Sequence, residues 1–386
     1  MTYRIPLVRD TISQPDLTAL AQWLTTNPHL TKGPLSEKFE TQFARWQGCR
    51  YAHYVNSGSS ANLLSVNALL ISGHLQAGDA VIAPAVSWTT TVAPITQLGL
   101  TPLLCDCDPN NLGLDVNHLE ALAQKPKVKA IIVCHILGIP NLMSKIKAIC
   151  KKYHLLLIED CCEALGSTYK TIRVGNFGVM STFSFYFGHH MSTIEGGMVC
   201  TNSRKFSNII RSLRSHGWNR DLDLSFKLKL RRRYHIDSFA DQYTFYHPGF
   251  NFRGTDLGAF LGLRQLKKLN LSIRRRHRLW QTYLQLTGKR NWQPQPPDSA
   301  YVSGFAYPLL SPHRSALATH LASAGIETRP LVCGSLGRQP WFIDRYGSVP
   351  LEHADLIHHQ GLYVPINPDL SVQEIKAIAS VLNLYA

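Results

Sequence analysis

Two adjacent histidines, His189 and His190, stand shortly before Glu195-Gly-Gly197. An imidazole ring can take up and release a proton near neutral pH, because its unperturbed pKa is about 6.5. A lone histidine is more often structural or exposed, but an adjacent pair before Glu-Gly-Gly is unusual. The pair is therefore a candidate for proton-transfer chemistry, although the spacing alone assigns no role to either ring.

A second candidate is the hydroxyl-rich segment Asn56–Asn62 (Asn-Ser-Gly-Ser-Ser-Ala-Asn), between an apolar run and a helical pattern. Small residues that open a helix expose backbone N–H groups, and the helix dipole favours an anion there. The hydroxyls of Ser57, Ser59 and Ser60 could add hydrogen bonds to a phosphate. The simpler alternative is that these residues only cap the helix.

A third candidate is Asp160, which closes an apolar run and is followed by Cys161-Cys162-Glu163. Its charge could hold a pyridinium nitrogen protonated, which would make the bound ring an electron sink. The alternative is that Asp160 caps the next helix.

Short apolar runs alternate with helical patterns before residue 205, as a doubly wound α/β sheet requires. Near-continuous Val, Ile and Leu predicts parallel strands buried on both faces. Ligands of such sheets bind at the carboxyl ends of the strands, where the three candidate motifs fall. The predicted strands lie at residues 80–86, 101–108, 129–138 and 154–166, and the predicted helices at 115–123 and 141–153.

The pattern changes near residue 220. Residues 221–250 are basic and aromatic with weak periodicity, which predicts irregular structure. A helical pattern follows at 256–286, and the rest predicts a small α+β domain. We expect a large domain at 1–250 and a small one at 251–386. In the small domain the expected elements are a strand at 305–310, a helix at 315–325 closed by Gly325, and a helix at 372–384.

The composition of the 386 residues bounds the class of protein. The net charge of +15 raises the possibility of a nucleic-acid partner, but the chain has no zinc-finger spacing and no aromatic-rich RNA signature. The basic runs at 227–233 and 274–278 suit either a solvated face or a diphosphate-bearing small molecule. Nine scattered cysteines, no apolar run of about 18 residues and no signal peptide predict a cytoplasmic protein without a membrane span.

The three motifs, in this order and spacing, resemble the DegT/DnrJ/EryC1/StrS sugar aminotransferase family. That family reads Ser-Gly-Thr/Ser-x-Ala, then Glu-Asp-x-x-Gln/His, then Phe-Ser-Phe-x-x-x-Lys-x-x-x-x-Gly-Glu-Gly-Gly. The likeness continues through Asn251-Phe-Arg253 and Gly262-Leu-Arg-Gln-Leu266. It implies the pyridoxal-phosphate (PLP) fold type I of aspartate aminotransferase: a mostly parallel central sheet with helices on both faces, plus a smaller C-terminal α+β domain.

Two departures change the expected chemistry. His189 occupies the position of the catalytic lysine, and Glu163 stands where aminotransferases have Gln or His. Both changes, with His216-Gly-Trp218 and Gly325-Ile-Glu-Thr-Arg-Pro330, resemble the histidine-containing 3-dehydratase branch, which acts on nucleotide-linked 4-keto-6-deoxyhexoses. A sibling branch carries an iron–sulfur cluster, which needs about four ligands. No cysteine lies between Cys200 and Cys333, so we expect no cluster and no other metal.

The resemblance implies a reaction and a role for each matching residue. Imidazole cannot bond covalently to the cofactor as lysine does, so PLP or its amine form (PMP) would be held non-covalently. With His189 as the base, the chain would remove the C3 hydroxyl of GDP-4-keto-6-deoxy-D-mannose, L-glutamate would regenerate PMP, and ammonia would be released. Around the cofactor ring, the resemblance implies Trp88 stacked on one face, Asp160 at the ring nitrogen and Glu163 near the ring hydroxyl. It implies Gly58, Ser59, Ser60 and Ser184 at the cofactor phosphate, with Asn251 reaching the phosphate of the neighbouring subunit in a homodimer with shared sites. His216 and Arg329 would contact the sugar or glutamate.

Three rival interpretations remain at this point. The first is a non-catalytic aminotransferase relative, which the intact Asp160, Ser184 and Asn251 disfavour. The second is a nucleic-acid-binding protein, which only the net charge supports. The third is a dehydratase for a different nucleotide sugar, and residues 221–247 do not reveal the base.

Overall fold

A seven-stranded sheet forms the centre of the computed structural model, which describes residues 3–288 and 292–385. The strands run parallel except for the one at 197–201, which is antiparallel to both neighbours. In spatial order they are β1 (Tyr51–Val55), β9 (Gly197–Thr201), β8 (Met180–Ser184), β5 (Leu156–Asp160), β4 (Val128–Cys134), β2 (Ala80–Pro84) and β3 (Thr101–Cys105).

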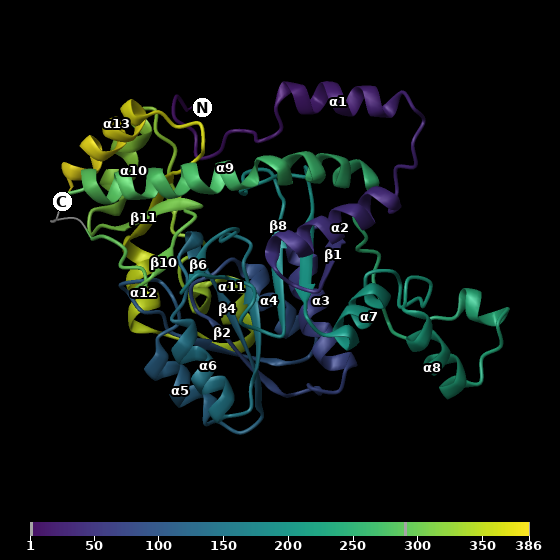
Figure 1. Ribbon diagram of the computed structural model, residues 1–386. Helices are drawn as coiled ribbons and strands as arrows, with labels where there is room; N and C mark the ends of the chain where they lie inside the picture. The colour runs from purple at the N-terminus through teal and green to yellow at the C-terminus, as the bar shows by residue number, and fades with distance from the viewer. Residues whose placement is uncertain (1–2, 289–291, 386) are drawn as a thin grey trace.

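Helices cover both faces of this sheet (Figure 1). Successive strand residues point to opposite faces, so Ile158 packs among residues of one helix layer while Leu157 packs among those of the other. One layer holds α3 (Gly58–Ile71), α4 (Thr89–Gln97) and α7 (Arg204–Leu213); the other holds α2 (Pro34–Gln47), α5 (Val116–Ala123), α6 (Met143–Lys152) and α9 (Asp256–Leu286). The predicted strands and helices of this part of the chain are confirmed.

A smaller antiparallel sheet lies in the C-terminal part of the chain, beside the end of α9 (Figure 1). The predicted strand and both predicted helices are confirmed, and Gly325 adopts a φ of 73° just after its helix. The domain boundary at residue 250 stays a prediction. The elements here are β11 (Ala306–Leu310), α10 (Arg314–Ser323), β12 (Arg329–Pro330), α11 (Pro340–Tyr346), α12 (Glu352–Gln360), β13 (Gly361–Pro365) and α13 (Val372–Asn383).

The N-terminal segment lies against the C-terminal part of the chain, just before β12. Ile5 forms a parallel bridge with Ile326, and the backbone N–H of Leu7 donates to the carboxylate of Glu327 over 2.9 Å. The remaining short elements are α1 (Gln14–Leu24), η1 (Ile136–Gly138), β6 (Thr168–Tyr169), β7 (Ile172–Arg173), η2 (Ala240–Tyr243), β10 (Ala300–Tyr301) and η3 (Leu336–Arg338).

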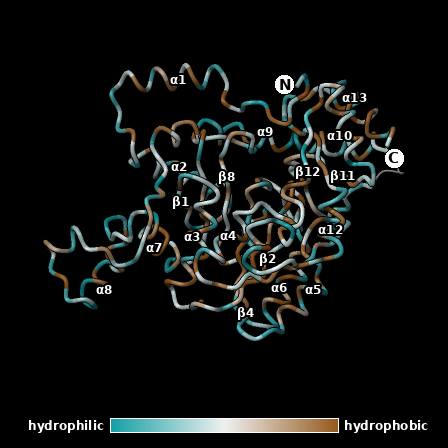
Figure 2. Tube along the Cα trace, turned by 180° about the vertical axis from the view of Figure 1, so that it is seen from behind, coloured by the Kyte–Doolittle hydropathy of each residue, from teal (hydrophilic) through white to brown (hydrophobic). Residues whose placement is uncertain are grey.

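The prediction of irregular structure at 221–250 is wrong for its first half, where α8 spans Leu224–Tyr234. Leucine, lysine and arginine are strong helix formers, and arginines in the last turn stabilise the negative end of the helix dipole. In Figures 1 and 2, α8 projects away from the body of the protein, so little of its surface is buried. The weak periodicity reflects this exposure: Leu230 is buried, but Leu224 is 70% exposed.

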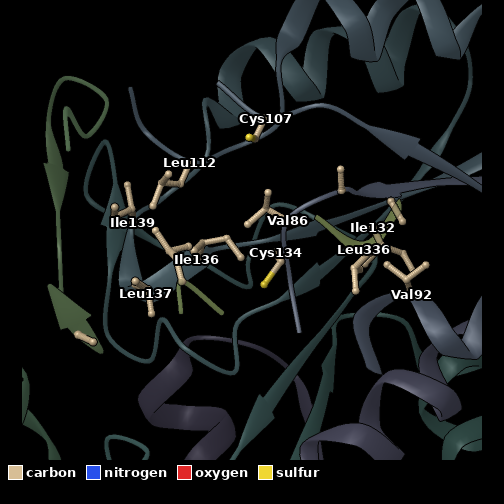
Figure 3. Close-up of a cluster of buried hydrophobic side chains, with 14 of the residues drawn as sticks. Val86, Val92, Cys107, Leu112, Ile132, Cys134, Ile136, Leu137, Ile139 and Leu336 are labelled. Atoms are coloured by element: carbon tan, nitrogen blue, oxygen red, sulfur yellow. The ribbon is translucent and has the colours of Figure 1, made fainter. Parts of the chain in front are cut away.

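The core beneath the carboxyl ends of the strands is apolar and closely packed. Figure 3 shows part of it, with Cys134 at the end of β4, Ile136 and Leu137 just after that strand, and Leu336 from the C-terminal part of the chain. This packing gives the loops above it a rigid base. None of the helices in the described ranges is both long and apolar enough to cross a membrane.

Candidate active site

A pocket of about 560 Å³ opens where β5 and β8 end and where β1 leads into α3. It also takes residues from the N-terminal segment and from the C-terminal sheet. Eight of the eleven residues to which the family resemblance gives a role line it, so the fold brings most of the predicted site together. These are Gly58, Ser59, Trp88, Asp160, Glu163, Ser184, His189 and Arg329.

The N-terminus of α3 presents unpaired backbone donors to the pocket. The Ser57 hydroxyl caps the helix by accepting the N–H of Ser60 at 3.0 Å. The N–H groups of Gly58 and Ser59 belong to the first turn, where no intrahelical acceptor exists. The cap and the anion cradle are therefore both present: Ser60 serves the cap, and the two preceding amides remain for an anion.

Gly58 lies where a side chain could not fit. A Cβ at this position would come 2.7 Å from the Cβ of Ser184 and 3.0 Å from the Sγ of Cys162. The close approach places the end of β8, the segment after β5 and the start of α3 around one small volume. This volume suits a phosphate held by amides and by the Ser184 hydroxyl.

Asp160 is a buried carboxylate held from several sides, and turns follow it instead of a helix, so the helix-capping alternative is wrong. One oxygen accepts hydrogen bonds from the Asn62 amide and the Thr91 hydroxyl, both at 2.8 Å. The other accepts the N–H of Cys162 at 3.0 Å. The Asn62 amide is oriented in turn by the hydroxyl of Thr182, at 2.6 Å. These donors fix the carboxylate at the pocket floor, where it could pair with a protonated ring nitrogen.

Trp88 immediately precedes α4 and is 55% exposed, so the alternative of a core aromatic is wrong. A large aromatic side chain left open in a pocket offers a flat face for stacking. Trp88 lines the same pocket as Asp160 and the first residues of α3, and this set of groups is what a phosphorylated pyridine ring needs.

The tautomer of His189 follows from its hydrogen bond. Its Nδ1 lies 2.7 Å from the carbonyl oxygen of Cys162. A carbonyl oxygen can only accept, so Nδ1 carries the proton and Nε2 keeps its lone pair. Because His189 lines the pocket, Nε2 is the atom available to a bound molecule.

Burial lowers the pKa of His189 to about 4, opposed in part by its hydrogen bond to Cys162 and by the charge of Asp160. The ring is therefore neutral at physiological pH and can accept a proton. A lysine at the same position would instead carry a charge there unless burial or a covalent bond removed it.

Glu163 shares the pocket and has the opposite perturbation. Burial, reinforced by the nearby charge of Asp160, raises its pKa to about 7, although the N–H of Leu137 donates to its Oε2 at 2.8 Å. The side chain can therefore exist in either protonation state near neutral pH, which suits a hydrogen bond to a phenolic hydroxyl.

Several pocket residues were not predicted from the sequence. Leu7 comes from the N-terminal segment, Phe305 from just before β11, Tyr363 from β13, and Glu327 pairs with Arg329 at 3.1 Å. Nothing local in the sequence marks the first three, because each reaches the pocket through a contact with a distant segment. Glu327 did have a signal, since it lies inside the Gly325–Pro330 motif. Asn62 had a signal: it ends the hydroxyl-rich motif one turn after Gly58.

His216 and Asn251 are not in the pocket. His216 is exposed, with a φ of 62°, and its N–H donates to the carbonyl of Phe250 at 2.7 Å. Asn251 is also exposed and bridges to Ser215, so the two predicted residues are neighbours on one outer surface. Within one chain they do not complete the site.

A buried trio of His135, Glu159 and Cys161 has the donor types of a metal site. The Glu159 carboxylate already accepts N–H bonds from Gly175 at 2.8 Å and from Phe177 and Gly178 at 2.6 Å. His135 adds a bond at 3.2 Å. These bonds occupy the carboxylate, so the trio serves as a structural network.

The parallel sheet, the amide cradle and the pocket at the strand ends define an aminotransferase-like fold of the aspartate aminotransferase class. The chain belongs to the DegT/DnrJ/EryC1/StrS aminotransferase family, whose model matches residues 11–383. The predicted family and fold class are confirmed.

Individual relatives cover nearly all of the chain. GDP-4-keto-6-deoxy-D-mannose 3-dehydratase of Escherichia coli O55:H7 is 34% identical, over 86% of this chain and 88% of that protein. The enzyme of the same name from Yersinia pseudotuberculosis is 33% identical over 98% of both chains. The solved E. coli enzyme with bound hydrated PLP superposes with a TM-score of 0.89 at 30% identity, over 99% of this chain and all of that one.

Proposed function

We propose that this protein removes the C3 hydroxyl of a nucleotide-linked 4-keto-6-deoxyhexose, with GDP-4-keto-6-deoxy-D-mannose as the first substrate to test. The observation that carries the proposal is the geometry of His189, which keeps its lone pair on Nε2 and lines the same pocket as Gly58, Ser59 and Asp160. The relatives named above for this reaction support it. The overall change consumes L-glutamate and yields a 3-deoxy-4-keto sugar, 2-oxoglutarate and ammonia.

We assign the PLP or PMP cofactor to the floor of the pocket, held without a covalent bond. Gly58, Ser59 and Ser184 would bind its phosphate, Asp160 its ring nitrogen, and Trp88 one face of its ring. Ser60 would act indirectly, by fixing the cap of α3. When bound, the cofactor supplies an electron sink that makes an adjacent C–H bond acidic.

His189 would move the proton. Its neutral imidazole accepts a proton at Nε2 while Nδ1–H stays bonded to the carbonyl of Cys162. The resulting imidazolium then donates to the C3 hydroxyl as it leaves, so one side chain acts as base and as acid. Because imidazole cannot replace lysine in amine transfer to the sugar, deoxygenation is the expected outcome. Glu163, with its pKa of about 7, would hold the ring hydroxyl.

Arg329 is the cation of the pocket wall, and we assign it to the carboxylate of glutamate or to the sugar nucleotide. His216 and Asn251 lie outside the pocket of their own chain, and we propose that they serve the pocket of a second copy in a homodimer with shared sites. We also propose a cytoplasmic enzyme, consistent with nine free cysteines.

A direct assay tests the function. The protein is incubated with PLP, L-glutamate and GDP-4-keto-6-deoxy-D-mannose, and ammonia and 3-deoxy sugar are followed. Equimolar release of both is the expected result, and formation of an amino sugar would contradict the proposal. A parallel arm with a dTDP-linked sugar tests the base, since the dTDP-4-dehydro-2,6-dideoxy-D-glucose 3-dehydratase of Saccharopolyspora spinosa is also 34% identical, over 90% of this chain and 79% of that protein.

A further inference from the structure

Arg276 is a buried cation in the middle of α9. It is 2% exposed, and its described partners are three carbonyl oxygens. One nitrogen donates to Gly304 at 3.1 Å, to Phe305 at 3.2 Å and to Ile366. A buried charge whose hydrogen-bond acceptors are carbonyl oxygens is costly, and burial lowers the pKa of Arg276 to about 10, opposed in part by the charge of Asp369. A hydrophobic side chain of similar length would avoid that cost, so a buried positive charge at this position suggests a functional role.

The segment that Arg276 binds is the one that holds the histidine pair. The carbonyl of Ser303 accepts a hydrogen bond from Nε2 of His190 at 3.0 Å. The ring of Phe305 lies 5.1 Å from the ring of His189, with the two planes tilted by 53°. Arg276 therefore lies directly behind the wall that supports both imidazoles.

The two histidines are held in opposite tautomers. Ser303 offers His190 a carbonyl, so Nε2 of His190 carries the proton, whereas in His189 the Cys162 carbonyl puts the proton on Nδ1. Nδ1 of His190 is buried without a partner among the residues described. Burial and the charge of Arg276 keep the pKa of His190 well below its usual value, so its ring is neutral. His190 therefore stays neutral and connects His189, its neighbour in the chain, to the 303–305 segment through its hydrogen bond to Ser303.

We propose that Arg276 is a positioning residue. Its hydrogen bonds hold the 303–305 segment against the His189–His190 pair, and its guanidinium keeps a fixed positive charge behind the two rings. The effect of Arg276 on turnover rests on the proposed function, whereas its effect on the position and the pKa of His189 is independent of that function. The pinning keeps Nε2 of His189 aimed into the pocket. The charge opposes protonation of His189 before substrate binds, so the base stays available.

Charges of both signs act on the His189 ring. The charge of Arg276 lowers the pKa of His189, whereas that of Asp160 raises it. Arg276 reaches His189 through the protein and not through the pocket, so a bound anion does not screen it directly. The ionisable groups around His189 are Asp160 at the end of β5, Cys162 and Glu163 after it, His190 and Glu195 on its own loop, Arg276 on α9, and Glu327, Arg329 and Tyr363 on the C-terminal side.

Histidine titration in the cofactor-free protein tests the proposal without reference to activity. Protein labelled with carbon-13 at the histidine ring is titrated by NMR, and the His189 signal is assigned from the spectrum of His189→Asn. In Arg276→Gln, which keeps N–H donors but loses the charge, the midpoint for His189 should rise by about one pH unit. Arg276→Lys should leave it near the wild-type value. Arg278→Gln, an exposed arginine two residues along α9, is the matched control.

An unchanged midpoint in Arg276→Gln would overturn the proposal, as would an equal rise in Arg276→Lys. His190→Asn tests the pinning half even where Arg276→Gln does not fold. It should lower kcat at least tenfold with KM within twofold, because His189 loses its lateral support while the rest of the pocket remains. Wild-type kcat in His190→Asn would refute the positioning role. If no sugar is dehydrated at all, the proposed function fails while the titration still decides the role of Arg276.

Discussion

The Nδ1 atom of His189 donates to the backbone carbonyl of Cys162, two residues after Asp160, across 2.7 Å. The end of β5 and the turn that follows it therefore supply both the carboxylate on the pocket floor and the acceptor that orients the base. His189→Asn keeps a side-chain amide that can donate to the same carbonyl but has no basic nitrogen. We expect it to lower dehydration at least 1000-fold while changing the cofactor Kd by less than about threefold. Ammonia release and cofactor titration by absorbance measure the two effects, and residual turnover above one per cent would remove His189 from its role.

The replacement His189→Lys tests whether the rest of the site still has aminotransferase geometry. We expect the introduced amine to bond covalently to PLP, because the cradle of α3 and Asp160 is unaltered. Borohydride reduction followed by mass spectrometry of the peptide 180–201 should find the added cofactor mass. The wild-type protein treated in the same way is the control and should carry none. Failure to trap PLP would show that the ring lies out of reach of this position.

The Asn62 amide bridges Thr182 and Asp160, with bonds of 2.6 and 2.8 Å. Asn62→Ala leaves the Asp160 carboxylate with one donor fewer and the Thr182 hydroxyl without its acceptor. A lost hydrogen bond to a charged group costs about 1.5–3 kcal/mol, so we expect the cofactor Kd to rise by roughly 10- to 100-fold. Ser65→Ala on the same helix is the matched control, since that buried hydroxyl bonds only to the carbonyl of Ala61. Equal Kd values in the two variants would exclude the bridge.

The raised pKa of Glu163 should make the free energy of unfolding depend on pH. Burial raises its pKa from 4.5 to about 7, so between these values the folded chain retains a proton that the unfolded chain has released. The stabilising contribution is complete below pH 4.5 and is lost as the pH rises through 7. Glu163→Gln does not titrate, so its free energy of unfolding should exceed that of the wild type increasingly with pH, by about 1–3 kcal/mol more at pH 8 than at pH 4.5. Urea unfolding of the cofactor-free proteins measures the difference, and a gap independent of pH would contradict the assignment.

Hybrid dimers test whether Asn251 serves the neighbouring site. A dimer of one His189→Asn chain and one Asn251→Ala chain contains one intact site only if Asn251 acts across the interface. Random mixing of the two inactive variants should then restore about a quarter of wild-type activity, from half of the dimers with one good site each. If Asn251 acts within its own chain, every site is defective and mixing restores nothing.

Strand ends and motif order made most of the pocket predictable. Asp160 terminates a strand with a clear apolar pattern, and the carboxyl ends of parallel strands meet at one edge. Ser184 was identifiable from the family motif, because its own strand, Met-Ser-Thr-Phe-Ser, has no continuous apolar run. His189 was identifiable because the residues around it keep the family spacing. The residues that orient these groups were not predictable. Thr91 and the carbonyl of Cys162 act through contacts between segments distant in sequence, which periodicity does not encode.

The wrong prediction at α8 has a different cause. Helix patterns in a sequence are visible when one face is buried, and α8 buries only Leu230. The intrinsic preference of its leucines, lysines and arginines was the available signal. Phe239 and Tyr243 beyond it are 83% and 77% exposed, so apolar residues there did not mark a core of this chain.

The 31-residue helix α9 has a mechanical consequence. At the first turn of the helix, Asp256 accepts hydrogen bonds from the N–H groups of Gly33 and Ser36, both at 2.8 Å. About 30 Å further along the helix, Arg276 donates a hydrogen bond to the segment beside the histidines. A continuous helix resists bending, so α9 connects these two contact regions rigidly. The predicted boundary near residue 250 would then mark a change of architecture and not a hinge. Substrates should enter and leave through loops at the rim, at a rate set by loop opening and not by rotation of one half against the other.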